Sequence, residues 1–349
     1  MTPEEALAAA AAEGIHRLAI PTPFAVGRVN CWLVEDDPLT LVDTGPNSGK
    51  ALDELERQLA ARGHRIEDLE LVIITHQHID HLGLIEIVAN RSKANVAAID
   101  VSAERLRNFT EDAERDDEFA AGLMRRYGIP EDVVTALRTV SASFRAWGAR
   151  AEVTRPLRDG ETLELRDRAL EVQHRPGHSP SDTVFWDARR RILLAADHLL
   201  AHISSNPLMA RPLDGSSGRP RALVDYIASM RRTRELDAQI VLPGHGEPIT
   251  NHRDLIDDRL AMHRRRAGKL LRLISNGPRS PYELAQEMWG NVAVTQAFLT
   301  LSEVVGHSDL LVASGLVAEV EGPDGVVRFE ATGADGDVML GGDVVSARE

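Results

Sequence analysis

The sequence places three histidines and one aspartate within six residues, a combination that could hold a metal ion. His76 and His78 are two positions apart, so on an extended backbone their side chains point to the same side. Asp80 and His81 follow directly. Several imidazoles and a carboxylate are costly to remove from water unless they bind something. Imidazole suits Zn, Fe, Ni and Cu, and the carboxylate keeps Zn, Fe and Mn as candidates. The alternative is a histidine-rich loop in solvent.

The elements on either side of this cluster favour a metal site over a solvated loop. Four apolar residues, Leu71 to Ile74, predict a buried β-strand that ends at Thr75. The apolar residues at 82, 84, 85, 87 and 88 have helical spacing, which places Asp80 and His81 at a loop-to-helix junction. A solvated loop rarely follows a buried strand with this order of ligand types.

The segment His76-Gln-His-Ile-Asp-His81 resembles the HxHxDH signature of the metallo-β-lactamase superfamily. In that family the remaining ligands lie further along the chain, at the ends of separate strands. Three such elements are present: a Pro-Gly-His-Ser-Pro segment supplies His178, an apolar strand ends at Asp197, and a second apolar strand ends at His245. An α/β sheet presents groups at one edge in this way. The ordered set covers roughly residues 15 to 250.

The resemblance implies a site with two divalent metal ions. His76, His78 and His178 would bind one ion, and Asp80, His81 and His245 the other, with Asp197 as a bridge. Zinc is the expected metal, and Fe or Mn also fits these ligands. Shared ligands leave room for a bridging water, whose pKa the cations lower so that hydroxide attacks the substrate. Asp80 and Asp197 are the candidate catalytic residues, because either could relay a proton to the leaving group.

Asp43 occupies a turn, Asp43-Thr-Gly-Pro46, that precedes the metal loop in the chain. It resembles the aspartate that supports the metal loop from behind in this family. A role as a turn cap is an equal alternative, and the two roles are compatible. Asp182 stands where several relatives carry a second histidine, so we expect it to affect substrate contacts more than metal binding. His174 lies outside the family pattern and is expected to be structural.

The ligand types indicate which branch of the family the chain resembles. Lactamases of the main subclass use a cysteine on the second metal, whereas the single cysteine here, Cys31, lies outside every ligand motif. The set looks most like that of glyoxalase II-type thioesterases, lactonases, and the phosphodiesterase or ribonuclease branches. We therefore expect a metal-dependent hydrolase of a small thioester, ester or lactone. The alternative is a metal-dependent ribonuclease or phosphodiesterase of the winged-helix branch.

The implied fold is α/β, the four-layered αββα metallo-β-lactamase fold with a helical insertion and a small C-terminal winged-helix-like α+β module. The catalytic domain would span residues 1–250, and the charged helical insertion at about 100–150 would act as a lid over the metal cleft. Its aromatic residues could hold the organic part of a substrate, or could simply pack the insertion onto the body. A linker helix and the winged-helix-like domain would follow over 251–332. Residues 333–349, rich in Gly and Asp, are expected to be disordered.

Charge and composition limit the partners. The 349 residues carry a net charge of −14, which argues against general nucleic-acid binding because phosphate contacts come from Lys and Arg. Arginine-rich stretches at 231–234 and 264–272 are the only support for a nuclease, and the C-terminal module is acidic. We expect a small-molecule substrate, with no nucleic acid and no membrane as partner. The module's role would be structural, an edge of the cleft, or a contact in a homodimer.

The start of the chain lacks the basic region of a signal peptide, and no apolar run approaches the 18 residues of a membrane span. We therefore expect a cytoplasmic protein.

Overall fold

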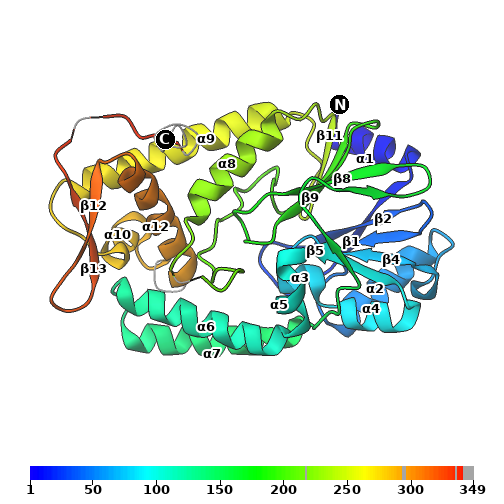
Figure 1. Ribbon diagram of the computed structural model, residues 1–349, viewed down its shortest axis with the longest axis horizontal. Helices are drawn as coiled ribbons and strands as arrows, with labels where there is room; N and C mark the ends of the chain where they lie inside the picture. Colours follow the sequence, from blue (N-terminus) through cyan, green and yellow to red (C-terminus); the bar gives the residue numbers. More distant parts are fainter. Residues whose placement is uncertain (217, 293–295, 335, 341–349) are drawn as a thin grey trace. The chain divides into compact units, whose positions relative to one another are not determined.

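The computed structural model describes residues 1–216, 218–292, 296–334 and 336–340. The chain forms two compact units, each assembled from three stretches (Figure 1). Unit 1 contains Met1–Ala113, Phe144–Ser205 and Glu235–His252. Unit 2 contains Glu114–Ser143, Asn206–Arg234 and the chain from Arg253 onward. The domain boundaries at 250 and 332 expected from the sequence stay predictions.

In the described part of unit 1, the first sheet has the strand order β1-β2-β3-β4-β5-β6. Strands β1 to β3 pair antiparallel, and β3 to β6 run parallel. The strands are β1 (Ile15–Ile20), β2 (Val29–Val34), β3 (Thr40–Val42), β4 (Leu71–Ile73), β5 (Asn95–Ile99) and β6 (Arg155–Leu157). Strand β4 is the one predicted above from Leu71 to Ile74, whereas the residues of β6, Arg-Pro-Leu, have no apolar alternation. Because β3 and β4 are parallel neighbours, their carboxyl ends meet at one edge of the sheet.

The second sheet of unit 1 has the order β11-β10-β9-β8-β7 in the described residues. Its strands are β7 (Thr162–Glu164), β8 (Ala169–His174), β9 (Thr183–Asp187), β10 (Ile192–Ala196) and β11 (Ile240–Pro243). The edge strand β11 runs parallel to β10, whereas the other pairs are antiparallel. The turns after β10 and β11 therefore lie next to each other.

The two sheets share one apolar core, and helices cover the outer face of the first sheet. Ile73 of β4 packs in a cluster with Phe185 of β9 and Leu242 of β11, and the small α1 residues Ala6 and Ala10 join it. The neighbouring β4 residue, Val72, belongs instead to a cluster with Leu55 and Val88 of two helices. This alternation is the two-residue period of a strand buried on both faces. The helices of unit 1 include α1 (Pro3–Ala12), α2 (Gly49–Ala60), α3 (Ile79–Leu82), α4 (Ile85–Ser92) and α5 (Ala103–Arg107).

Unit 2 is mainly helical, with a hairpin near its C-terminal end (Figure 1). Its elements are α6 (Phe109–Arg126), which begins in unit 1, α7 (Glu131–Phe144), which ends there, α8 (Ala222–Arg234), α9 (His252–Ile274), α10 (Pro281–Trp289), α12 (Ala297–Ala313), β12 (Val317–Glu321) and β13 (Val327–Ala331). Ser280 caps α10 through a reciprocal capping box with Glu283. Helices followed by a hairpin agree with the expected elements, and the winged-helix designation stays a prediction.

Part of the expected disordered tail packs onto unit 2. Leu340 is buried, and the Met339 amide donates to the Ser314 hydroxyl at 2.8 Å. Residues 335 and 341–349 of that tail lie outside the described residues. Among the helices described, none is both long and apolar enough to cross a bilayer.

Candidate metal centre

Asp43, at the end of β3, holds the loop that follows β4. Its carboxylate accepts hydrogen bonds from the Thr75 amide at 3.0 Å and the Thr75 hydroxyl at 2.8 Å. The ring of His81 lies against the same carboxylate, with Nδ1 2.7 Å from Oδ2. Asp43 is 2% exposed and has a left-handed φ of 60°. Such a conformation in a buried non-glycine residue persists only where surrounding contacts enforce it. The prediction that Asp43 supports the loop is therefore confirmed.

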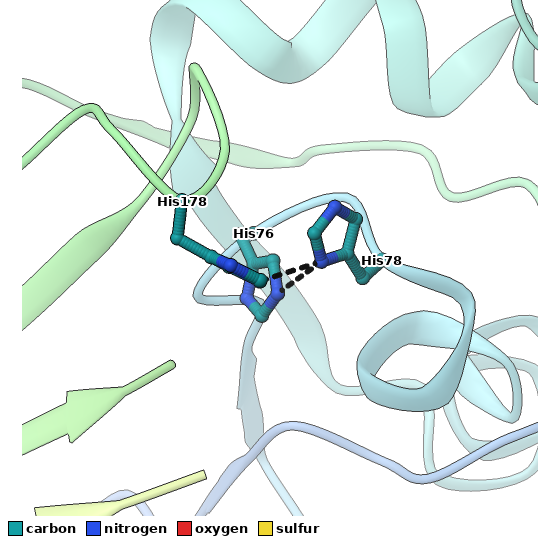
Figure 2. A group of neighbouring side chains, drawn as sticks. All are labelled: His76, His78 and His178. Atoms are coloured by element: carbon teal, nitrogen blue, oxygen red, sulfur yellow. Dashed lines mark hydrogen bonds between the residues drawn. The ribbon is translucent and has the colours of Figure 1, made fainter. Parts of the chain in front are cut away.

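Three imidazoles converge on one point (Figure 2). His76 and His78 come from the loop after β4, and His178 comes from the loop after β8. The Nδ1 atom of His78 lies 3.0 Å from Nε2 of His76 and 2.9 Å from Nε2 of His178. Burial and the neighbouring His178 lower the pKa of His78 to about 3, and burial with the other imidazoles lowers the pKa of His76 well below its usual value. Both rings are therefore neutral, the form in which imidazole binds metals.

A second group contains Asp80, His81 and His245. Asp80 and His81 lie within the single-turn helix α3 rather than just before a helix, and His245 follows β11 directly. The Nε2 atom of His245 is 3.2 Å from Oδ2 of Asp80. Its other ring nitrogen, Nδ1, donates to the Arg28 carbonyl at 2.9 Å. That bond places the ring proton on Nδ1, so the lone pair of Nε2 faces the Asp80 carboxylate.

Asp197 lies between the two groups. Its Oδ1 is 3.5 Å from Nε2 of His81, and its Oδ2 is 3.5 Å from Nε2 of both His178 and His245. Burial would raise the pKa of Asp197, but His81 and His245 bring it well below its usual value. Burial would likewise lower the pKa of His81, and Asp197 with Asp43 raises it instead. The carboxylate is thus ionised among imidazoles from both groups.

The donor atoms fit a metal ion. Within the described chain, Nε2 of His81, Oδ1 of Asp197 and Nε2 of His245 are buried and have no hydrogen-bond partner. Buried polar atoms in proteins are almost always satisfied, so such exceptions require an explanation. These atoms belong to residues whose potential ligand atoms lie within 4.8 Å of one another in each group. A divalent cation accepts lone pairs from imidazole nitrogen and carboxylate oxygen and would satisfy all three atoms.

The turns after β10 and β11 depend on small residues that the sequence analysis does not single out. A Cβ atom on Gly244 would lie 2.3 Å from Oδ1 of Asp197 and 2.8 Å from Cε1 of His81. Ala196, directly before Asp197, has a φ of 44°. The position of Gly244 beside His245 is the one signal in the sequence that could have identified it.

Three residues discussed in the sequence analysis, Asp182, His174 and Cys31, belong to neither group. Asp182 is 2% exposed and accepts hydrogen bonds from the Ser179 amide and hydroxyl, so it holds the His178 turn rather than facing a substrate. Burial raises its pKa to about 6. His174 lies 2.9 Å from the Pro180 carbonyl, which agrees with the expected structural role. Cys31 is buried in β2.

Comparison with known proteins identifies the family. The family model described as the metallo-beta-lactamase superfamily matches residues 25–245. The "Probable metallo-hydrolase YqjP" of Bacillus subtilis (strain 168) is 34% identical over 301 residues, which cover 86% of this chain and 93% of that protein. The "Acyl-coenzyme A thioesterase MBLAC2" of Bos taurus is 30% identical over 235 residues, covering 62% and 73%.

A solved structure shows the same fold. The crystal structure of a metallo-beta-lactamase family protein from Thermus thermophilus matches with a TM-score of 0.75 at 28% identity, covering 91% of this chain and 98% of that one. The family resemblance expected from the His76–His81 motif is thereby confirmed, and it extends over most of the chain. The protein belongs to the metallo-β-lactamase superfamily and is a metallo-hydrolase with the α/β fold of that family.

Proposed function

We propose that the chain is a dinuclear metallo-hydrolase whose two ions share Asp197. The observation that carries this proposal is the position of Asp197, with one carboxylate 3.5 Å from imidazoles of both three-residue groups. His76, His78 and His178 would hold one ion, and Asp80, His81 and His245 the other. Zinc is the proposed metal because nitrogen-rich sets with carboxylate suit it, and Fe or Mn is the alternative.

The proposed substrate is a small thioester, ester or lactone, with an acyl thioester first. The relative from Bos taurus is named an acyl-coenzyme A thioesterase, which supports this choice. Divalent cations in such a site would lower the pKa of a water molecule and polarise the scissile carbonyl. Water adds to the carbonyl carbon, the carbon–sulfur bond breaks, and the leaving thiolate takes up a proton. We propose Asp80 or Asp197 as the group that passes that proton.

The ribonuclease alternative has little support from the charges of unit 2. Arg234 of α8 forms two hydrogen bonds to Asp257, at 2.7 and 2.8 Å, and Arg266 of α9 lies 2.9 Å from Glu303. These cations of the arginine-rich stretches are already paired with carboxylates. RNA therefore serves as the comparison substrate in the test.

Metal content is the first test. Protein loaded with zinc and dialysed should retain two equivalents per chain, measured by elemental analysis. Asp197→Ala should retain less than the wild type and lose at least a hundredfold in turnover, because one carboxylate serves both groups. His64→Ala is the matched control, since His64 pairs with the exposed Glu35 and belongs to neither group. One equivalent in the wild type, or full turnover by Asp197→Ala, would contradict the dinuclear proposal.

Turnover is the second test. The zinc-loaded protein is assayed with acyl thioesters, lactones and labelled single-stranded RNA. Thioester hydrolysis that a chelator removes and added zinc restores, without RNA cleavage, would support the proposal. RNA cleavage that His76→Ala abolishes, with no thioester or lactone turnover, would instead make the protein a nuclease.

A further inference from the structure

Three aromatic rings from distant parts of the sequence meet in unit 1. The Phe24 ring lies 5.7 Å from the Phe144 ring and 6.4 Å from the Trp147 ring, both in edge-to-face geometry. Phe24 belongs to the loop between β1 and β2, whereas Phe144 ends α7 and Trp147 ends the following 3₁₀ turn, η3 (Arg145–Trp147). Edge-to-face pairs at these distances are favourable contacts. We call Phe24, Phe144 and Trp147 the aromatic cluster.

The aromatic cluster leaves apolar surface in water. Phe144 is 42% exposed, and Val26, two residues after Phe24, is 39% exposed. Single exposed apolar side chains are normal, but here the exposed Phe144 ring packs against Phe24, and grouped apolar side chains are typical of a binding surface. The loop that carries Phe24 is also ordered by its own contacts: the Thr22 hydroxyl donates to the Gly27 carbonyl at 2.5 Å and accepts from the Phe24 amide at 3.1 Å. The loop backbone at Phe24 is thus held in place, and the Phe24 side chain is only half-buried.

Both chain segments that carry the aromatic cluster contact residues of the candidate metal centre or residues next to it in the sequence. On one side, the Trp147 carbonyl accepts from the Asn47 amide at 2.7 Å. The next residue, Gly148, approaches Ile79 so closely that a Cβ there would lie 2.9 Å from the Ile79 side chain. In the sequence Ile79 stands between His78, which belongs to the first group, and Asp80, which belongs to the second.

On the other side, the loop carrying Phe24 ends at Arg28, whose carbonyl accepts the hydrogen bond from His245 at 2.9 Å. Two residues further on, in β2, the Asn30 amide donates to the Gly244 carbonyl at 2.7 Å. One segment thus contacts the His76–His81 loop and the other contacts the turn after β11, and the Phe24 ring packs against the rings of Phe144 and Trp147.

We propose that the aromatic cluster is the subsite for the apolar acyl group of the substrate, next to the metal centre that cleaves the acyl bond. This inference rests on the proposed hydrolase function and specifies its substrate class as acyl groups of medium length rather than acetyl. Aromatic faces hold an alkyl chain through contact area alone, so the preference grows with each methylene. A fully buried methylene contributes about 0.8 kcal/mol, which is roughly fourfold in kcat/KM.

The kinetic test compares acetyl, butyryl, hexanoyl and octanoyl thioesters of one thiol, using zinc-loaded full-length protein. The wild type should gain roughly two- to fourfold in kcat/KM per methylene. Phe144→Ala and Phe24→Ala should lower the octanoyl-to-acetyl ratio of kcat/KM at least tenfold, and Phe144→Leu should restore part of it. Val320→Ala is the control, because Val320 is also exposed, at 43%, but lies on β12 of unit 2. An unchanged ratio in both alanine variants would overturn the subsite while leaving the hydrolase function intact.

A binding test separates the two proposals. Calorimetric titration with octanoate and with acetate measures the apolar preference without turnover. Octanoate should bind the wild type at least tenfold more tightly than acetate does, and Phe144→Ala should remove most of this difference. If no thioester, ester or lactone is hydrolysed but this pattern holds, the hydrolase proposal is wrong and the apolar subsite remains. If thioesters are hydrolysed but octanoate binds no better than acetate, the subsite is wrong.

Discussion

Gly244→Ala should disable the metal centre although it adds only one methyl group. The new Cβ would lie 2.3 Å from Oδ1 of Asp197, roughly 1 Å closer than two non-bonded heavy atoms tolerate. The backbone cannot move away easily, because the Gly244 amide donates to the Ala196 carbonyl and its carbonyl accepts from the Asn30 amide, each at 2.7 Å. The Asp197 carboxylate must therefore move instead.

The size of the effect follows from that displacement. Overpacking a buried site costs about 1–3 kcal/mol, which the folded state should survive. A shift of roughly 1 Å in a catalytic group costs about a hundredfold in rate. Gly244→Ala should thus remain folded by circular dichroism, lose about a hundredfold in kcat/KM, and retain less zinc after dialysis. Gly49→Ala is the control, because a Cβ at Gly49 meets nothing within 4 Å. Wild-type zinc content and turnover in Gly244→Ala would refute the claim that glycine is required for the Asp197 geometry.

Three further predictions concern the loop support and unit 2. Asp43→Asn should weaken zinc binding about 10- to 100-fold in a chelator competition, because the charge behind His81 is lost; unchanged affinity would contradict this role. Burial lowers the pKa of His263 to about 3 in the folded protein, whereas the pKa in the unfolded chain is about 6.5. The neutral, buried His263 therefore contributes its full stability above about pH 6.5, and this contribution is lost as the pH falls toward 3. Going from pH 7 to pH 5 should cost about 2 kcal/mol in urea unfolding of the protein, and His263→Leu should flatten that dependence; an equally steep profile in the variant would exclude His263 as its source. Arg219→Ala should cost about 3–5 kcal/mol, because it leaves the buried Asp309 carboxylate without its paired cation; a loss below about 1 kcal/mol in denaturant unfolding would show the pair to be dispensable.

The strands that carry the candidate ligands, and the convergence of those residues, could be predicted because their signals are local. An apolar run such as Leu71 to Ile74 predicts a buried strand by itself, and the His-x-His-x-Asp-His spacing identifies a family. The structure brings all seven residues expected as ligands together, in the two groups and the bridge that the resemblance implies. Their role as ligands is the part that metal analysis has to test.

Features that depend on distant parts of the chain could not be predicted in the same way. Phe24 and Phe144 are 120 positions apart, and no local pattern connects them, so the loop between β1 and β2 escaped the sequence analysis. The requirement for glycine at position 244 exists only because Asp197 lies against it. Asp182 could be expected near a substrate from its place after His178, whereas its burial and its bonds to Ser179 are visible only in three dimensions. The expected role of the 100–150 insertion as a lid stays a prediction.

The position of β11 at the edge of its sheet has a consequence for how the protein is made. A ribosome releases the chain from its amino terminus, so the residues of the first three-imidazole group are all available once His178 has emerged. His245 follows 67 residues later, just after β11, the strand that adds to β10 and is followed by Gly244. Until then the nascent chain holds only one complete group, and Asp197 lacks His245, one of its three imidazole neighbours. The second candidate group can therefore form only after His245 has been synthesised, whereas the three imidazoles of the first group are present 67 residues earlier.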